Sequence, residues 1–252
     1  MARIIAISNQ KGGVGKTTTT LNLGAYLAKA GKRVLLVDAD PQGNTSSGLG
    51  LDKRAISRSV YEVLLGEEGI ERILYSARIK GLYLAPSLPS LAAAEIELVD
   101  LPDREFRLKQ ALAPIRAYYD YILIDCPPSL GLLTVNALSA ATDLLVPVQA
   151  EYYALEGLGQ LTDTVERVRS KLNPGLNLLG LLLTMDSRTV LSREIASELE
   201  IHFPGQVFSS VIPRNIKLAE SPSFGKTILE YDGFSKGARS YRSLAQEILR
   251  HA

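Results

Sequence analysis

Short apolar runs alternate with amphipathic segments along the whole chain, and this pattern predicts the order of its elements. Near-continuous apolar runs are typical of strands that a parallel sheet buries on both faces. We expect strands over residues 4–7, 34–37, 81–85, 121–125, 144–148, 178–184 and 207–212. Apolar positions three and four apart predict helices over residues 21–30, 59–65, 91–98, 104–113, 132–141, 155–172, 191–199 and 236–250. The alternation of strands and helices predicts an α/β fold, a doubly wound, mostly parallel sheet with helices on both faces.

The first predicted strand leads directly into a glycine-rich loop, Gln10-Lys11-Gly12-Gly13-Val14-Gly15-Lys16-Thr17-Thr18. Glycines let backbone N–H groups converge on one anion, and the next helix directs the positive end of its dipole at the same place. In such a loop Lys16 would reach the β and γ phosphates of a nucleotide, and Thr17 would be a ligand of Mg²⁺. The loop departs from the G-x-x-x-x-G-K-[ST] pattern, because Gln10 stands at the first glycine position with Lys11 beside it. The alternative is a glycine-rich turn that binds nothing.

Acidic residues stand at the carboxyl ends of two further predicted strands. Because the carboxyl ends of neighbouring parallel strands meet at one edge of a sheet, Asp40 and Asp125 can converge with Lys16 on one crevice. We assign Asp125 to hold Mg²⁺, directly or through its water shell, unless it merely caps the next turn. Asp40 is placed to contact the metal site and to orient a water molecule against the γ-phosphate. Asp38, two positions earlier, is either structural or supports this site from behind, and the pattern leaves both open.

The composition is that of an ordered globular protein. The chain has 252 residues, of which 46% are hydrophobic and 22% charged, so we expect an ordered single domain over residues 1–252. A net charge of +1 gives no indication of a general affinity for nucleic acid, so any basic surface must be local. Cys126 is the sole cysteine, which excludes an internal disulfide; we take it as a small buried hydrophobe, with a redox role as the alternative. Without a signal-peptide pattern or an apolar run of about 18 residues, we expect a soluble, cytoplasmic protein.

Five short motifs follow one another along the chain and together carry a family resemblance. They read NQKGGVGKTTT at 9–19, VDADPQGN at 37–44, IDCPPSLG at 124–131, EYYALEG at 151–157 and VIPRN at 211–215. In this order they resemble the ParA/Soj partition ATPases, from about residue 3 to the end of the chain. Because the loop begins at residue 10, the chain is similar to the short form that has no N-terminal DNA-reading domain.

The resemblance implies a P-loop NTPase of the deviant Walker A class. In that class Lys11 reaches across a dimer interface to the partner's nucleotide, and residues 11–18, Glu151 and Pro213 contact ATP. Two ATP molecules are held between the subunits of an ATP-dependent homodimer, which binds double-stranded DNA without sequence preference. A ParB-type partner stimulates the Mg²⁺-dependent hydrolysis, which is slow on its own. The resemblance therefore implies a nucleoid-associated protein that helps to segregate a chromosome or a plasmid. Tyr152 and Tyr153, beside Glu151, could serve either the site or the packing.

The C-terminal part of the chain is more basic than the rest. Between residues 209 and 252 there are seven cations against four acids. This charge alone favours a solvated surface without a partner, but the family resemblance favours DNA, and we assign Arg188 and Arg214 to its binding. The rival is a membrane-associated positioning ATPase of the MinD type. We expect the tail at 240–252, which has few cations, to pack on the domain rather than to lie on lipid. A small-molecule ligase on the same fold, such as a biotin-pathway synthetase, has only the loop in its favour.

Overall fold

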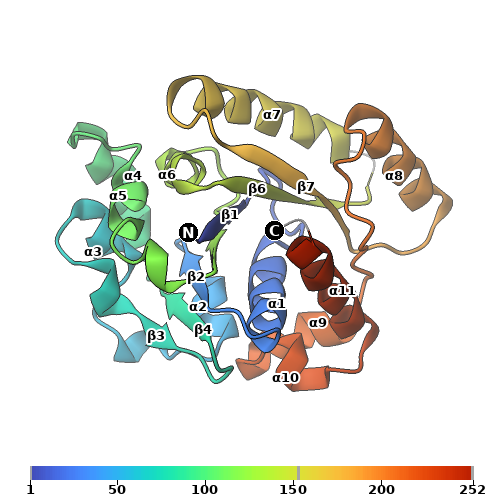
Figure 1. The fold of residues 1–252 in the computed structure, drawn as a ribbon, viewed down its shortest axis with the longest axis horizontal. Helices are drawn as coiled ribbons and strands as arrows, with labels where there is room; N and C mark the ends of the chain where they lie inside the picture. The colour runs from blue at the N-terminus through green and yellow to red at the C-terminus, as the bar shows by residue number, and fades with distance from the viewer. Residues whose placement is uncertain (1, 152–153, 251–252) are drawn as a thin grey trace.

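A seven-stranded sheet crosses the molecule and carries helices on both faces (Figure 1). The computed structural model describes residues 2–151 and 154–250. The strands lie in the order β3-β4-β2-β5-β1-β6-β7, and all pair in parallel except β3 with β4. Their bounds are β1 (Arg3–Ile7), β2 (Val34–Asp38), β3 (Tyr75–Ser76), β4 (Leu82–Ala85), β5 (Tyr121–Asp125), β6 (Asp143–Gln149) and β7 (Asn177–Thr184). The predicted fold class is confirmed.

The helices fall into two layers. One layer holds α1 (Lys16–Lys29), α9 (Ile216–Glu220), α10 (Ile228–Asp232) and α11 (Lys236–Arg250). The other holds α3 (Val60–Leu65), α4 (Leu91–Glu97), α5 (Arg107–Leu112), α6 (Leu132–Ala140), α7 (Ala154–Lys171) and α8 (Val190–His202). The short helix α2 (Asn44–Gly48) follows β2. Single turns of 3₁₀ helix occur at Lys53–Ala55, Ile70–Ile73, Leu98–Asp100, Arg116–Tyr118 and Ser221–Phe224.

The central strand β1 shows why the sheet has two cores. Its side chains alternate with a period of two, so that Ile4 and Ala6 join the core under α3–α8. Ile5 and Ile7 point to the opposite face and join the core under α1 and α11. A strand buried on both faces has no polar side, which explains its uninterrupted apolar sequence.

The strand order reverses at β1, and this places the site. From β1 the chain passes to β2 on one side, and β6 and β7 are then added on the other side. In open α/β sheets the crevice at such a reversal, beyond the carboxyl ends of the strands, binds the ligand. The glycine-rich loop that follows β1 therefore lies at the position where this fold forms its binding site.

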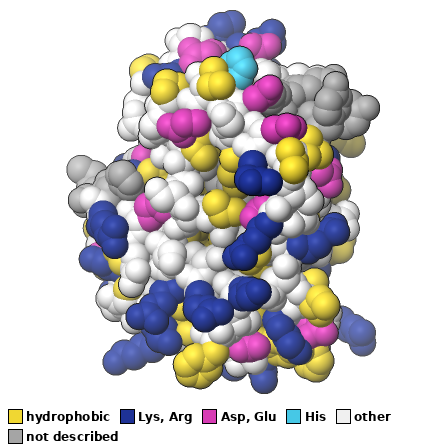
Figure 2. Space-filling view, turned by 90° about the vertical axis from the view of Figure 1, so that its right-hand side faces the viewer, with side chains coloured by type: hydrophobic (Ala, Val, Ile, Leu, Met, Phe, Trp, Pro, Cys, Tyr) yellow, Lys and Arg dark blue, Asp and Glu magenta, His cyan; other side chains and the backbone are white. Residues whose placement is uncertain are grey.

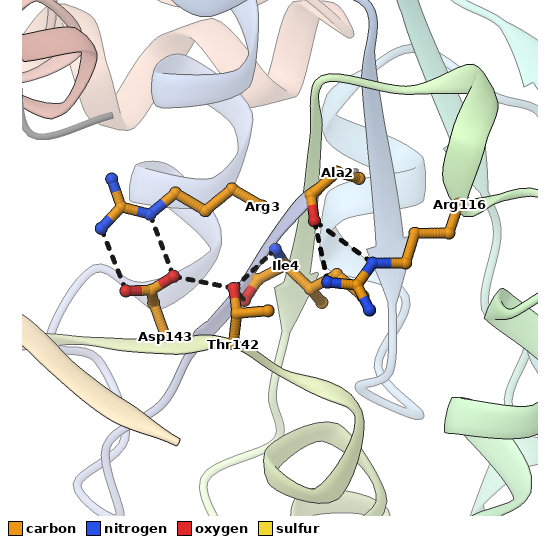
Figure 3. Close-up of polar contacts among 6 residues, drawn as sticks. All are labelled: Ala2, Arg3, Ile4, Arg116, Thr142 and Asp143. Carbon is orange, nitrogen blue, oxygen red and sulfur yellow. Dashed lines mark hydrogen bonds and ion pairs between the residues drawn. The ribbon is translucent and has the colours of Figure 1, made fainter. Parts of the chain in front are cut away.

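A polar network fixes the register of β1 and β6 at the opposite end of the sheet (Figure 3). The Arg3 guanidinium makes a two-pronged ion pair with the Asp143 carboxylate, at 2.9 and 3.0 Å. Thr142 Oγ1 lies 2.7 Å from Asp143 and accepts a hydrogen bond from Ile4 N at 3.0 Å. Because these bonds hold the amino ends of both strands, their carboxyl ends reach the loop in a defined register.

The structure corrects several predicted elements. Residues 207–212 do not form a regular strand; they follow β7 through isolated hydrogen bonds, from Phe208 N to Leu181 O and from Ile212 N to Leu183 O. The N–H groups of Ser209 and Ser210 donate instead to the Glu247 carboxylate, so Ser210 N, the next donor on the β7 side after Phe208 N, is not available to a ladder. The sequence pattern also missed α2, β3, α9 and α10, each of which has at most five residues and is too short to show a hydrophobic period.

Candidate active site

The backbone of the glycine-rich loop is shaped to receive an anion. Gly13 and Gly15 have φ angles of +77° and +91°, a region that side chains disfavour. Helix α1 begins at Lys16, and no side chain caps its first turn. The first N–H groups of a helix have no partner within the helix, so those of α1 are available to a ligand.

Side chains from two neighbouring strands hold the loop from outside. Asn9 Nδ2 donates to Pro147 O of β6 at 2.7 Å, and Asn9 Oδ1 accepts from Lys11 N at 3.0 Å. Thr184 Oγ1, at the end of β7, donates to Val14 O at 2.8 Å. The loop is thus positioned by β6 and β7 as well as by β1.

Lys16 points into the site and is 7% exposed. Its Nζ donates to the carbonyl oxygen of Lys11 in the same loop at 3.1 Å. Burial lowers the pKa of Lys16 below its ordinary value, while the carboxylates of Asp125 and Asp40 act in the opposite direction. Carboxylates that follow β2 and β5 thus act on the charge of Lys16.

Asp125 lies fully buried at the end of β5. Its Oδ2 accepts from Thr45 Oγ1 of α2 at 2.7 Å, and Thr17 also donates to this carboxylate. Burial raises the pKa of Asp125 to about 6, against the effect of these hydrogen bonds and of the Lys16 charge. A carboxylate that is costly to ionise when alone favours a cation beside it.

The two acids after β2 have different surroundings. Ser46 donates twice to the buried Asp38, whose Oδ2 accepts from Ser46 N at 2.8 Å and from Ser46 Oγ at 2.7 Å. Asp38 therefore holds α2 against the sheet. Of the two roles that the sequence left open for Asp38, this contact favours the structural one. Asp40, 7% exposed, accepts from Gln42 N at 2.9 Å and lies nearer the mouth of the crevice.

Lys11 faces away from Lys16. Its Nζ forms an ion pair with Glu151 Oε2 at 2.8 Å, with both side chains partly exposed. The hydrogen bond to Lys11 holds the pKa of Glu151 below its usual range, and the charge of Arg214 acts in the same direction. Lys11, Glu151 and Arg214 thus form one charged group at the rim. Tyr152 and Tyr153 lie outside the described residues.

A hollow of 290 Å³ opens beside the loop. Gly15 and Thr18 form one wall, and Pro213 and Arg214 contribute to the other. The lining is mainly apolar, which suits the flat base of a nucleotide whose phosphates lie on the loop. The structure thus places Arg214, a candidate for DNA binding, at the hollow beside the glycine-rich loop.

Arg188 lies beside an adjoining hollow, which shares Pro213 with the first and is also lined by Asp186. With Lys236 and Arg239 at the start of α11, Arg188 lines this second hollow of 260 Å³. Figure 2 shows Lys and Arg side chains gathered over the lower part of this face, where the C-terminal helices lie. We call Arg188, Lys236 and Arg239 the cationic face. The sequence pattern singled out only Arg188, because the proximity of β7 to α11 is a tertiary contact.

Thr45 and Asn9 were also missed as site residues. Thr45 directly follows the motif at residues 37–44, and a hydroxyl next to a motif with two acids was the feature of the sequence that could have identified it. Cys126 is buried, and burial raises the pKa of its thiol, so it packs as a small hydrophobe. Among the described residues no three His, Cys, Asp or Glu side chains gather into a metal site.

The fold and the loop define a P-loop protein, and comparisons with known proteins identify its family. A family model described as an AAA domain matches residues 2–178. The chromosome partitioning protein ParA of Myxococcus xanthus is 53% identical over 99% of this chain and 89% of its own length. The sporulation initiation inhibitor protein Soj of Bacillus subtilis is 53% identical over 98% of both chains. This chain belongs to the ParA/Soj family of chromosome partitioning ATPases.

Solved structures agree on the fold. A cobyrinic acid a,c-diamide synthase structure from Mycobacterium smegmatis, with a bound ATP analog and magnesium, has a TM-score of 0.88 and 42% identity. The match covers 100% of this chain and 96% of the synthase chain. The cell division ATPase MinD of Pyrococcus furiosus has a TM-score of 0.81 and 30% identity over the whole of both chains.

Proposed function

We propose that this chain is a nucleotide-switched partition ATPase that binds DNA when it holds ATP. The observation that carries the proposal is the convergence of Lys16, Asp40 and Asp125 behind a loop that bears a second, outward-facing lysine. One lysine is placed to bind the phosphates of its own subunit. The other is free at the rim to reach a second subunit once its ion pair with Glu151 opens.

The residues divide the chemistry of ATP hydrolysis between them. The α1 N–H groups and Lys16 bind the β and γ phosphates, and the base lies in the hollow beside Pro213. Thr17 and Asp125 would hold Mg²⁺, with Asp40 as a further candidate ligand, and the metal would supply charge neutralisation at the phosphates. Asp40 orients the attacking water, and the partner subunit's Lys11 adds a positive charge where negative charge develops.

The cationic face is the proposed DNA site. Lys and Arg side chains without base-specific geometry bind phosphates and give affinity without sequence preference. Two such faces on one ATP dimer engage DNA at a high effective concentration, so dimerisation turns weak binding into retention. A ParB-type partner then stimulates hydrolysis and releases the dimer, which places the protein on the nucleoid during segregation.

The membrane-associated alternative needs an amphipathic face for lipid. In α11 the apolar side chains Tyr241, Leu244 and Ile248 are buried against α1 and the sheet, and only the polar side is exposed. Among the described residues no helix is both long and apolar enough to cross a bilayer. The packing of α11 therefore favours the DNA-binding function over the MinD-type one.

The test is cosedimentation of the purified protein with plasmid DNA or with anionic liposomes, each with ATP, ADP or no nucleotide. We expect ATP-dependent retention on DNA, weak retention with ADP, and none on liposomes. ATP-dependent binding to liposomes but not to DNA would support the MinD-type function. Absence of ATP hydrolysis, with turnover of a small amide-forming substrate instead, would support a ligase.

A further inference from the structure

Two buried hydrogen bonds join α1, the helix behind the loop, to the C-terminal helices. Thr19 Oγ1 lies 3.1 Å from the hydroxyl of Tyr241 in α11. Asn22 Oδ1 accepts from Ile228 N, in the first turn of α10, at 2.7 Å. Thr19, Asn22 and Tyr241 are each at most 2% exposed. Because a buried polar group left without its partner is costly, a displacement of α1 must carry α10 and α11 with it.

Each of these bonds continues back to the loop through one further hydrogen bond. Thr19 N donates to Gly15 O at 2.9 Å. Asn22 Nδ2 donates to Thr18 O at 2.8 Å, so its amide spans the loop end of α1 and the start of α10. The loop and the C-terminal helices are therefore connected by an unbroken series of hydrogen bonds.

A third contact joins the other side of the site to the same helices. Gly50, just after α2, lies so close to Gly225 that a Cβ on Gly225 would be 2.5 Å from the Gly50 Cα. The Arg78 guanidinium contacts both Gly225 O and Glu230 of α10. Since Thr45 of α2 also donates to Asp125, α2 connects this carboxylate to the segment that leads into α10.

We infer that these contacts couple nucleotide binding to DNA affinity within a single subunit, before any dimer forms. The inference rests on the proposed function. Lys16 must exchange its bond with the Lys11 carbonyl for phosphate oxygens when ATP binds, and the first turn of α1 moves with the loop. The cationic face is built from two elements that are attached at different points. Helix α11 is tied to α1 through Tyr241, whereas Arg188 belongs to the β7–α8 connection, which is held at the loop by the bond from Thr184 to Val14 O. A movement of α1, and with it α11, relative to the β7–α8 connection therefore changes the spacing of the cations that contact successive phosphates.

The experiment separates this coupling from dimerisation by using Lys11→Ala, which is expected to bind ATP as a monomer. DNA dissociation constants are measured with saturating ATP and without nucleotide, and sedimentation verifies the monomer. We expect ATP to tighten DNA binding by at least about fivefold, the lower end of common allosteric couplings. By linkage, saturating DNA should tighten ATP binding by the same factor.

The quantity compared between variants is the ratio of the DNA dissociation constant without nucleotide to that with saturating ATP. Asn22→Ala and Tyr241→Phe, each in the Lys11→Ala background, should bring this ratio close to one. Asn136→Ala is the matched control: Asn136 is also a buried helix amide, bonded to Arg104 O and Leu132 O, but lies in the opposite layer. It should lose stability and keep the ratio. Thr19→Val breaks the Tyr241 bond from its other end, so its effect should not add to that of Tyr241→Phe.

The outcomes are distinct. A ratio that is unchanged in Tyr241→Phe and Asn22→Ala overturns the coupling. So does a ratio of one in Lys11→Ala when the native dimer binds DNA with ATP, because dimerisation alone would then be the switch. Failure of the native protein to bind DNA with any nucleotide overturns the proposed function instead, and the coupling with it.

Discussion

At the scale of single residues, two lysines of one loop face different partners. Lys16 points inward towards Asp125, whereas Lys11 points outward to Glu151. Lys16→Ala should abolish productive ATP binding, because each charged hydrogen bond lost costs about 1.5–3 kcal/mol. Lys11→Ala should keep monomeric ATP affinity and lose ATP-dependent dimerisation. Fluorescent-nucleotide titration and sedimentation check both. An equal loss of ATP affinity in the two variants would contradict the cross-interface role of Lys11.

Substitutions of the two carboxylates Asp40 and Asp125 should also affect different steps, hydrolysis in one case and nucleotide binding in the other. Asp40→Ala should bind ATP and dimerise but hydrolyse about 10²–10⁴-fold more slowly, because it loses the group that orients water and keeps the phosphate contacts. A trapped ATP dimer on a sizing column is the expected sign. Asp125→Ala should instead weaken Mg²⁺-dependent ATP binding. Hydrolysis at the native rate by Asp40→Ala would move the water-orienting role to another residue.

At the scale of elements, α11 supports a segment that is not a strand. The Glu247 carboxylate accepts from Ser209 N at 2.7 Å and from Ser210 N at 3.0 Å. Glu247→Ala should lower the free energy of unfolding by about 1–2 kcal/mol, as two hydrogen bonds to a charged group are lost at a partly exposed position. Hydrogen exchange should quicken at Ser209 and Ser210. Exchange should stay slow at Phe208, whose N–H donates to β7. Equal protection of all three amides in the variant would show that Glu247 does not hold this segment.

At the scale of the whole molecule, the DNA site depends on how many cationic faces one particle presents. Each phosphate neutralised adds about −0.9 to the slope of log affinity against log salt. The ATP dimer should therefore show roughly twice the slope of the monomeric Lys11→Ala variant. Arg188→Ala should weaken binding equally on unrelated sequences and leave dimerisation intact. A native slope equal to that of the monomer would show that one face alone contacts DNA.

Arg214→Ala, our second candidate for DNA binding, needs ATP affinity measured beside DNA affinity. Arg214 lines the hollow next to the loop and acts on Glu151, so its loss can reach DNA through the nucleotide. A DNA defect that disappears at saturating ATP would assign Arg214 to the nucleotide site. A defect that persists at equal dimer concentration would keep it in the DNA site.

The sequence by itself determined the sheet and the place of the loop. Apolar strands without a polar side can be stable only when both faces are covered, so runs such as residues 121–125 predict a parallel sheet with helices on either side. Glycines before Lys16, and acids at strand ends, follow from local chemistry that does not depend on distant residues. These features are encoded within single segments, and the family motifs lie in the same segments.

Tertiary structure decided what joins segments far apart in the chain. Lys11 and Glu151 are 140 positions apart, and only the pairing of β1 with β6 brings them to one rim. Residues 207–212 are predicted to form a strand, yet the Glu247 carboxylate accepts from Ser209 N and from Ser210 N, and the second of these is a donor that a ladder with β7 would use. The hydrogen bonds of Thr19 and Asn22 with α11 and α10 leave no periodic signal. Hydrophobic periodicity reports which face of an element is buried, whereas the partner of a buried polar group depends on which elements pack together.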